Sequence, residues 1–294
     1  MKYIIRFLVS TVVLLTVVYF TAGFYVAYQI LKIDPTCGLH EGSLPNSWST
    51  TVDSHEYSIL ARQKVRENFN FKDYYLDEWQ DVYFQSRDSD IKINGWLFNY
   101  FPNRPIIIVT HGISPNGKCK SEANLIASFL VNKKFNVLTI DLRNYGQSDT
   151  VSSYDDLGLK SYNDILGAFD FLKKIGFKSN SIGLHGISLG ASTSIFAAHA
   201  EPEIRAVWAD SSLAEFNMIL KDEISRYGLA IEFGPAVSLA GRILTGIDPS
   251  KLSPAEKLSL TKLLTSRLFG IDFNRIELLL KEFDESSYHS ISYY

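Results

Sequence analysis

Between an apolar run, Ile182 to His185, and a stretch of small residues, Ala191 to Ala200, the chain reads Gly186-Ile187-Ser188-Leu189-Gly190. This G-x-S-x-G spacing predicts a sharp turn from a strand into a helix, with the serine exposed at its tip. A serine on such a turn has strained backbone, and side chains two positions before or after it would collide, so glycine is favoured at both places. A glycine-rich loop in an ordinary α/β domain could carry the same five residues. The interpretation therefore depends on the rest of the chain.

Two further motifs follow buried strands upstream of this turn. The run 105–110, Pro-Ile-Ile-Ile-Val-Thr, is typical of a buried parallel strand and leads directly into His111-Gly112-Ile113-Ser114. A second apolar run, 137–140, leads into Asp141-Leu142-Arg143-Asn144-Tyr145-Gly146-Gln147-Ser148. Polar segments at the ends of parallel strands meet at one edge of a sheet, so these loops are expected near Ser188.

With H-G, D-x-R-x-x-G-x-S and G-x-S-x-G in this order, the chain resembles the α/β-hydrolase superfamily, and within it the serine aminopeptidase-like and Bem-type bacterial hydrolases. The likeness runs from about Tyr83 to about Leu260. It implies a mostly parallel sheet with helices on both faces and a small helical cap. Many relatives have glycine where Asn144 stands, but asparagine tolerates left-handed backbone better than most residues.

The resemblance also implies roles for individual residues. Ser188 would be the nucleophile that forms an acyl-enzyme, and the backbone amides of Ile113 and Leu189 would form the oxyanion hole. His111 is expected to shape its loop by hydrogen bonding rather than to transfer protons. No cofactor and no metal are expected, because this chemistry needs neither.

The general base and its acid are harder to find. The fold supplies them late, in the order serine, acid, histidine. The part of the chain after Lys262 is shorter than the roughly 45 residues that two strands, two helices and their loops need. By order and type, Asp272 is the candidate acid and His289 the candidate base, and Asp210 is an alternative acid. Asp272 could equally cap a helix, Asp210 could be a turn residue, and His289 could lie in an exposed tail.

Two hypotheses about function follow. In the first, the chain is a membrane-anchored serine hydrolase that cleaves a small ester, thioester or amide, including peptide substrates. In the second, it is a catalytically impaired remnant, either a binding module or a truncated gene product, that lacks a working acid and histidine pair.

The N-terminal segment 1–33 predicts a transmembrane signal anchor. Phe7 to Leu31 contains no charged residue, and a helix of this length exceeds the roughly 30 Å of membrane hydrocarbon. Phe20, Phe24, Tyr25 and Tyr28 gather at its far end, as in an interfacial aromatic belt. Lys2 and Arg6 precede the apolar run, which favours a cytoplasmic N-terminus and a domain on the outer face of a bacterial cell membrane.

Composition agrees with one catalytic domain behind this anchor. The chain has 294 residues, of which 46% are hydrophobic, and a formal net charge of −3, so no bias toward nucleic acid is present. Cys37 and Cys119 lack metal-ligand spacing. They could pair if the domain is exported, but free thiols are expected. The expected domains are a connector, 34–77, with a helical stretch from Ser54 to Glu67, and a hydrolase domain, 78–294, with a cap at about 213–252 and an atypical end at 262–294.

Several elements of the hydrolase domain can be placed by pattern. The segments 83–86 and 91–98 are expected to form an antiparallel pair around the turn 87–90. A helix is expected from Tyr162 to Ile175, ending at Gly176, and a strand from Ile204 to Ala209. The cap is expected to consist of amphipathic stretches broken by Gly228, by Gly234-Pro235, and by Gly241 and Gly246.

Overall fold

The computed structural model describes residues 1–33, 37, 42–48, 70–113 and 119–258. The chain divides into two compact units, Met1–Pro254 and Ala255–Tyr294, and only the helical residues 255–258 of the second are described. The helical stretch expected from Ser54 to Glu67, the atypical end at 262–294, Asp272 and His289 all lie outside the described residues.

A mixed sheet forms the centre of the first unit. Its six described strands are β1 (Gln80–Gln85), β2 (Lys92–Phe98), β3 (Ile106–Thr110), β4 (Asn136–Ile140), β5 (Ile182–Ile187) and β6 (Val207–Asp210), in the order β1-β2-β4-β3-β5-β6. The pairs β1–β2 and β2–β4 are antiparallel, whereas β3–β4, β3–β5 and β5–β6 are parallel. The expected antiparallel pair is confirmed. The last strand begins at Val207 rather than at Ile204, because the Ile204 amide donates to the Glu201 carbonyl in a turn.

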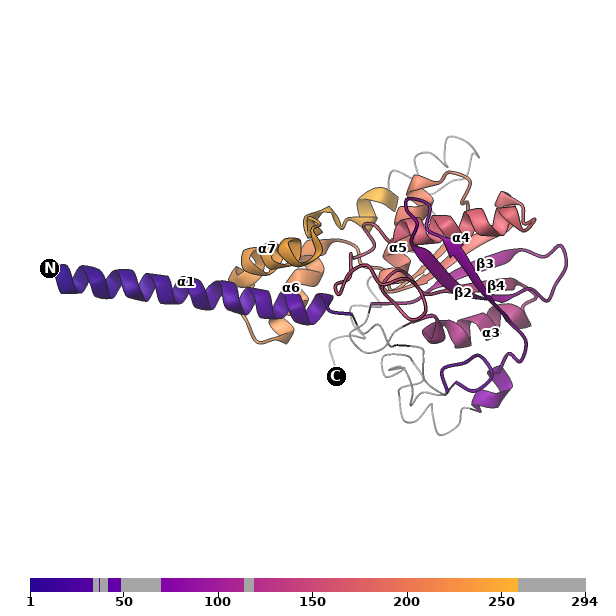
Figure 1. Cartoon of the computed structure of the whole chain (residues 1–294), viewed down its shortest axis with the longest axis horizontal. Coiled ribbons are helices and arrows are strands. Elements are labelled where there is room, and N and C mark those ends of the chain that lie inside the picture. The colour runs from indigo at the N-terminus through magenta and orange to yellow at the C-terminus, as the bar shows by residue number, and fades with distance from the viewer. Residues whose placement is uncertain (34–36, 38–41, 49–69, 114–118, 259–294) are drawn as a thin grey trace, which may run out of the picture. The chain divides into compact units, whose positions relative to one another are not determined.

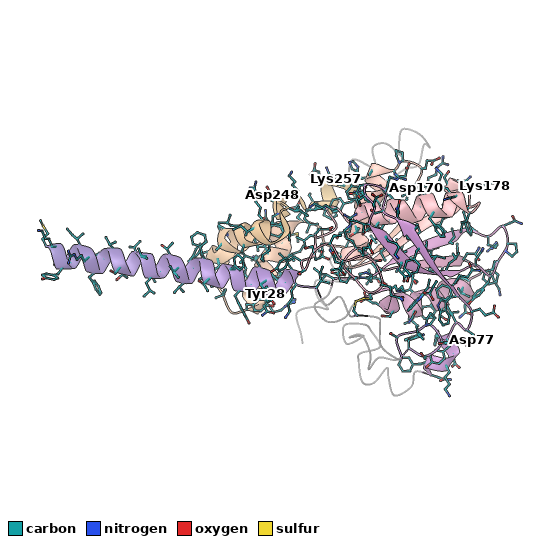
Figure 2. The ribbon with its side chains drawn as sticks, viewed as in Figure 1. Tyr28, Asp77, Asp170, Lys178, Asp248 and Lys257 are labelled. Atoms are coloured by element: carbon teal, nitrogen blue, oxygen red, sulfur yellow. A yellow bond between two sulfur atoms is a disulfide. The ribbon has the colours of Figure 1, made fainter. Side chains whose placement is uncertain are left out.

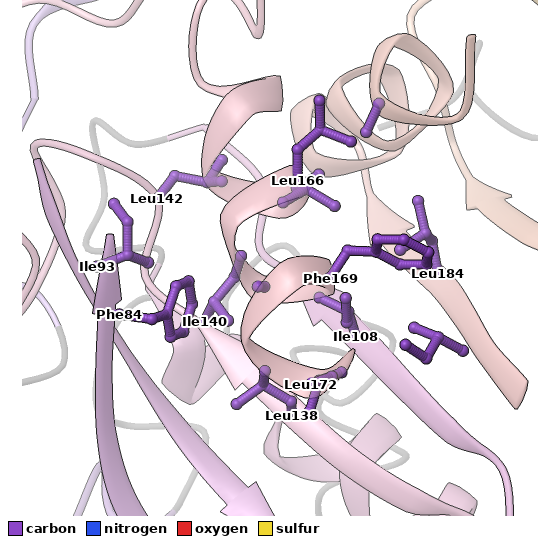
Figure 3. Packing of buried hydrophobic residues seen from close by; sticks show 14 of the residues in the cluster. Phe84, Ile93, Ile108, Leu138, Ile140, Leu142, Leu166, Phe169, Leu172 and Leu184 are labelled. Atoms are coloured by element: carbon purple, nitrogen blue, oxygen red, sulfur yellow. The ribbon is translucent and has the colours of Figure 1, made fainter. Parts of the chain in front are cut away.

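Helices cover both faces of the sheet, because alternate side chains of the buried strands point in opposite directions. On one face Val109 and Val137 pack with α3 (Asn124–Asn132). On the other, Ile108 and Leu138 pack with α4 (Tyr162–Lys174) and α5 (Leu189–Ala200). Figure 1 shows α3 on one side of the sheet and α4 and α5 on the other. Figure 3 shows side chains of α4 against those of β3 and β4. Each such side chain, once fully buried, stabilises the fold by roughly 1.5–3 kcal/mol.

Helix α4 confirms the expected helix and ends as expected. Its cap is Ile175, and Gly176 follows with φ 108°, a backbone that favours glycine. Its outer side is charged: Asp170 (Figure 2) pairs with Arg87 at 2.7 Å. Short 3₁₀ helices connect the larger elements at η3 (Phe71–Tyr74), η4 (Lys120–Ala123), η5 (Ser179–Ser181), η6 (Ile231–Phe233) and η7 (Pro249–Lys251).

The N-terminal helix α1 (Lys2–Leu31) is long and apolar enough to cross a membrane. Its first turns are exposed, whereas Gly23, Val26 and Leu31 near its end are buried. Directly after it, Lys32 forms a β-bridge with Tyr154, and the Asp155 amide donates to the Leu31 carbonyl at 2.8 Å. The end of α1 is therefore fixed to the segment that precedes α4.

The region expected to be a cap contains α6 (Phe216–Arg226) and α7 (Gly234–Thr245), with η6 between them. Gly246 ends α7 in left-handed backbone with φ 67°, as a glycine after a helix commonly does. The expected break at Gly241 is wrong. Gly241 lies inside α7, where an added Cβ would make ordinary contact at 3.5 Å from Cδ1 of Leu31, so the helix runs through this glycine without a break.

Cys37 and Cys119 form a disulfide, so the expectation of free thiols is wrong. The two residues are 82 positions apart in sequence, and their Cα atoms lie 5.8 Å apart, a separation typical of disulfides. The bond ties the segment that follows α1 to the start of η4. Nothing local in the sequence marks this pairing, because the fold alone brings the two cysteines together.

Candidate active site

Ser188 lies on a strained turn between β5 and α5. Its backbone has φ 53° and ψ −113°, outside the regions that non-glycine residues ordinarily occupy. The Ser188 amide donates to the Asp210 carbonyl at 2.8 Å, and the Ser188 carbonyl accepts from Ala191 at 3.0 Å. The side chain is half-buried, so its hydroxyl is accessible at the tip of the turn.

The glycines on either side make this turn sterically possible. A Cβ at Gly186 would lie 2.2 Å from the carbonyl oxygen of Gly190. A Cβ at Gly190 would lie 2.4 Å from the carbonyl oxygen of His111 and 2.6 Å from that of Thr110. Both contacts are with backbone, which cannot move aside as a flexible side chain can. The turn and the end of β3 therefore approach each other more closely than any residue except glycine allows.

The two residues expected to form the oxyanion hole flank the serine. Leu189 is the first residue of α5 and is buried, and Ile113 follows β3 in the segment that packs against the same apolar cluster. Among the described residues, none accepts a hydrogen bond from either backbone amide. The preceding amide, that of Gly112, is already engaged, because it donates to Oε2 of Glu122 at 2.7 Å.

His111 shapes this loop, as the sequence predicted. Its ring is fully buried, Nε2 accepts a hydrogen bond from the Leu142 amide at 3.1 Å, and Nδ1 lies 2.7 Å from the Gly112 carbonyl oxygen. The accepting Nε2 requires a neutral ring with its proton on Nδ1. Burial lowers the pKa of His111, which keeps the ring neutral. His111 thus joins the loop after β3 to the loop after β4.

The motif that begins at Asp141 is structural. Asn144 adopts φ 72°, the left-handed backbone expected for it, and a Cβ at Gly146 would collide with the Asp141 carboxylate. Arg143 is buried and binds Asp164 of α4 at 2.7 Å. These contacts fix the loop after β4 to the sheet and to α4.

One buried ion pair beside the site was missed by sequence reasoning. Lys120 and Asp141 are both buried and form a salt bridge, and Lys120 Nζ also donates to Gln147 at 3.1 Å and lies 4.6 Å from the Trp96 ring centroid. The pair anchors η4 to the end of β4. No sequence signal could have found it, since an isolated lysine is ordinarily a surface residue.

Of the candidate acids and bases, only Asp210 lies among the described residues, together with the nearby His185 of β5. Asp210 ends β6 beside the serine, but its carboxylate accepts a hydrogen bond from Ser211 at 3.0 Å, and no described residue accepts one from the Ser188 hydroxyl. His185 is buried in β5, with its ring 5.1 Å from that of Trp208 and its Nδ1 without a hydrogen-bond partner among the described residues. Asp272 and His289 lie outside the described residues, so their roles stay predictions.

Strand β6 forms the end of the described sheet and is exposed throughout. All four of its residues are exposed, and 66% of the Trp208 surface is accessible. Among the described residues, no group of three or more histidine, cysteine or acidic side chains could hold a metal ion.

Comparisons with known proteins agree with this architecture. Residues 105–229 match the model of the α/β-hydrolase fold family. Over 138 residues the chain is 28% identical to thiohydrolase aneE of Aspergillus aculeatus; the match covers 47% of this chain and 42% of that protein, so the chain spans less than half the length of this curated relative.

Solved structures include two similar α/β proteins. The esterase Pf2001 of Pyrococcus furiosus is 21% identical, with a TM-score of 0.47 and coverage of 66% of this chain and 80% of that one. The α/β hydrolase GrgF of Penicillium sp. sh18 is 21% identical, with a TM-score of 0.43 and coverage of 66% and 68%. The family match over residues 105–229, the strand order and the three motifs on their expected elements give the chain the α/β-hydrolase fold.

Proposed function

We propose that the chain is a membrane-anchored serine hydrolase that cleaves a small ester, thioester or amide through an acyl-enzyme at Ser188. The observation that carries the proposal is the backbone of Ser188, with φ 53° and ψ −113° between two glycines that no other residue could replace without collision. Strained backbone of this kind persists only where the surrounding structure holds it, and it concentrates at functional sites.

The mechanism uses groups on both sides of the turn. The Ser188 hydroxyl would attack the carbonyl carbon of the substrate while a base removes its proton, and the carbonyl oxygen would become an oxyanion. The amides of Leu189 and Ile113, which no described residue engages, would donate to that oxyanion. His289 would be the base, oriented by Asp272. As the oxyanion collapses to the acyl-enzyme, the bond to the alcohol, thiol or amine would break, and His289 would pass its proton to that leaving group. Water would then release the acid product by attack on the acyl-enzyme.

The relatives point toward carboxylic esters and thioesters. The curated relative is named a thiohydrolase and the Pyrococcus structure an esterase. We extend this bond class to the present chain and place it nearest the Bem-type and aminopeptidase-like bacterial hydrolases. The substrate itself would be chosen by the cap.

The disulfide supports the proposed location on the outer face of a cell membrane. Disulfides persist in oxidising compartments and are rare in the cytosol. The Cys37–Cys119 bond begins only a few residues after α1, so the chain that follows the helix would lie in such a compartment. This agrees with the positive residues Lys2 and Arg6 on the other side of the apolar segment.

A fluorophosphonate probe, which labels activated serines covalently, tests the proposal. The full chain in detergent should be labelled, Ser188→Ala should abolish labelling, and His289→Ala should lower it strongly. Ser181→Ala, at the end of η5 and away from the turn, is the matched control and should label like the wild type. Absent labelling of a folded protein, or labelling that survives Ser188→Ala, would refute an acyl-enzyme at Ser188.

The exposure of β6 favours a second candidate function, a catalytically impaired remnant that binds ligands without turning them over. Among the described residues β6 is the last strand of the sheet, and native proteins usually cover or blunt an exposed strand of this kind. In this case the probe would fail to label the folded chain. Weak turnover would not decide between the two functions, because a site without its base keeps about 10³–10⁴-fold acceleration over water.

A further inference from the structure

Helix α7 packs along α1 through small residues. Gly23 and Ala27 of α1 are four positions apart, as are Ala236 and Ala240 of α7, and all four are buried. The approach is close: a Cβ at Gly23 would lie 2.5 Å from Cβ of Ala236. Small residues four positions apart on both helices are typical of helix pairs that associate within lipid, where close backbone contact replaces the hydrophobic effect.

The two helices run in the same direction. At the start of the contact the Tyr19 ring stacks on that of Phe233 at 5.1 Å, and the Tyr19 hydroxyl donates to the Glu232 carbonyl at 2.8 Å. At its end Gly241 faces Leu31. The turn η6, which precedes α7, therefore lies beside Tyr19 in the middle of α1, whereas the later part of α7 lies beside the C-terminal end of α1.

Most of the large exposed side chains on the free side of η6 and α7 are apolar, and Glu232 and Arg242 are the exposed charged residues there. Ile231 is 48% exposed, and Leu239 and Ile243, four positions apart on one face of α7, are 46% and 63% exposed. Single exposed apolar residues are ordinary on soluble proteins. Here they adjoin a helix whose entire first half exposes apolar side chains, so the apolar surface is continuous.

The length of α1 sets the depth of the cap. About 20 helical residues cross the roughly 30 Å of hydrocarbon. A span that starts after Lys2 therefore ends about three residues beyond Tyr19, and one that starts after Arg6 ends about seven residues beyond it. At about 1.5 Å per residue, η6 beside Tyr19 lies about 5–10 Å inside the far boundary, the depth typical of interfacial helices. Leu239 lies near the boundary and Ile243 among the headgroups. The exposed side chain of Glu232 can extend toward the headgroups, as long charged side chains do at membrane surfaces.

The same apolar cluster reaches the candidate active site. It contains Val26 and Leu31 of α1, Val237 of α7, and Leu189, and Ile113 packs against it. The residues that flank Ser188 thus belong to one apolar cluster with the membrane helix and the cap. Packing therefore joins the end of α1, the cap and the turn that carries Ser188 into one body.

We propose that η6 and the exposed face of α7 insert into the outer boundary of the bilayer that α1 crosses, and that the site takes its substrate from that bilayer. The substrate class is then an ester or thioester of a long acyl chain dissolved in the membrane. The inference rests on the proposed anchor and, for the substrate, on the proposed hydrolase. In this arrangement the exposed side chains of η6 and α7 contact lipid rather than another protein.

Depth measurements test the insertion. The native cysteines are both in the disulfide, so one engineered cysteine is the sole free thiol for a fluorescent label. The full chain would be labelled through Ile231→Cys, Leu239→Cys or Ile243→Cys and reconstituted in phosphatidylcholine vesicles that contain doxyl-labelled lipids. Ile175→Cys, 45% exposed at the end of α4, is the matched control for an exposed isoleucine outside the cap. Val13→Cys, in α1, reports the anchor.

The expected order of quenching is Val13, then Ile231, Leu239, Ile243 and last Ile175, with several-fold stronger quenching at Ile231 than at Ile175. Quenching at Val13 together with equal, low values at Ile231, Leu239 and Ile175 would overturn the insertion and leave the anchor intact. Absent quenching at Val13 would overturn the anchor itself and the insertion with it.

Turnover tests the source of the substrate. A long-chain nitrophenyl ester embedded in vesicles would be compared with the soluble acetate ester, and the ratio of the two rates measured for Leu239→Lys and for Ile175→Lys. Leu239→Lys replaces an apolar side chain at the lipid boundary with a charged one, so the cap should insert less deeply and the ratio should fall several-fold, whereas Ile175→Lys should not change it. An unchanged ratio in Leu239→Lys would overturn delivery from the bilayer. Absent turnover of both esters in the wild type would instead refute the proposed hydrolase.

Discussion

Replacement of Gly190 by alanine is the sharpest test of the turn that carries Ser188. The new methyl group would lie 2.4 Å from the His111 carbonyl oxygen and 2.6 Å from that of Thr110, about an ångström short of ordinary contact. Thr110 is held in β3 by pairing with both β4 and β5, so the strand cannot move away alone. The turn would therefore shift relative to the loop that carries Ile113.

Both the stability and the chemistry should respond. Forcing an extra carbon into a packed interior costs about 1–3 kcal/mol of unfolding free energy. A displacement of about 1 Å between a nucleophile and the groups that stabilise its transition state can cost about 100-fold in rate. Gly190→Ala should thus unfold at lower urea concentration and react with the fluorophosphonate probe about 100-fold more slowly than the wild type.

Gly183→Ala in the same strand that leads to the turn is the matched control. Its methyl group would lie 2.9 Å from Cδ1 of Ile107, the flexible end of a side chain, which can rotate away. We expect a loss of less than about 1 kcal/mol and an unchanged labelling rate. Should Gly190→Ala match Gly183→Ala in both measurements, the close approach between the turn and β3 would be refuted. If the wild type is not labelled at all, the difference in stability still tests the packing.

Three further predictions concern the surroundings of the site. The Cys37–Cys119 bond closes a loop of 82 residues, so its reduction should lower the free energy of unfolding by up to about 4 kcal/mol. Urea unfolding with and without reductant measures this loss, and equal unfolding midpoints would contradict it. Burial and the neighbouring Asp156 charge raise the pKa of Asp155 to about 7. Between about pH 4 and pH 7 the folded state therefore holds a proton that the unfolded state has released. The free energy of unfolding should fall by on the order of 4 kcal/mol as the pH rises through this range. Asp155→Asn should flatten that part of the stability curve, and an unchanged slope would show that another group causes it. His111→Ala leaves the buried Leu142 amide without its acceptor, so it should cost about 1–3 kcal/mol in urea unfolding and slow probe labelling, whereas wild-type stability with normal labelling would contradict the bridging role.

Local patterns in the sequence predict most of the sheet and the turn. The apolar runs before Ser188 and Asp141 become β5 and β4, because strands buried on both faces carry mostly apolar runs rather than a strict apolar–polar alternation. Asn144 shows the same local logic, since its tolerance of left-handed backbone can be judged from the residue type alone.

Long-range pairings could not be predicted in this way. The disulfide joins cysteines 82 positions apart, and the packing of α7 on α1 joins segments more than 200 residues apart, as in the hydrogen bond between Tyr19 and Glu232. Gly241 shows the difficulty: a glycine inside an amphipathic stretch suggests a break, but α7 continues through it, since tertiary context commonly overrides the low helix propensity of a single glycine. Strand β6 begins at Val207, three residues after the predicted start at Ile204, because a turn at Ile204 competes with extended backbone.

The hydrogen bonds that fasten the end of α1 have a consequence for how the molecule searches for substrate. Because Lys32 and Ile33 pair with Tyr154 and Ser153 rather than leading into a free tether, the body carrying Ser188 cannot swing away from the helix. A bilayer that holds α1 would then keep Ser188 at a constant distance from the membrane surface. Encounters would occur by lateral diffusion in a single plane, and molecules far from that plane would stay out of reach.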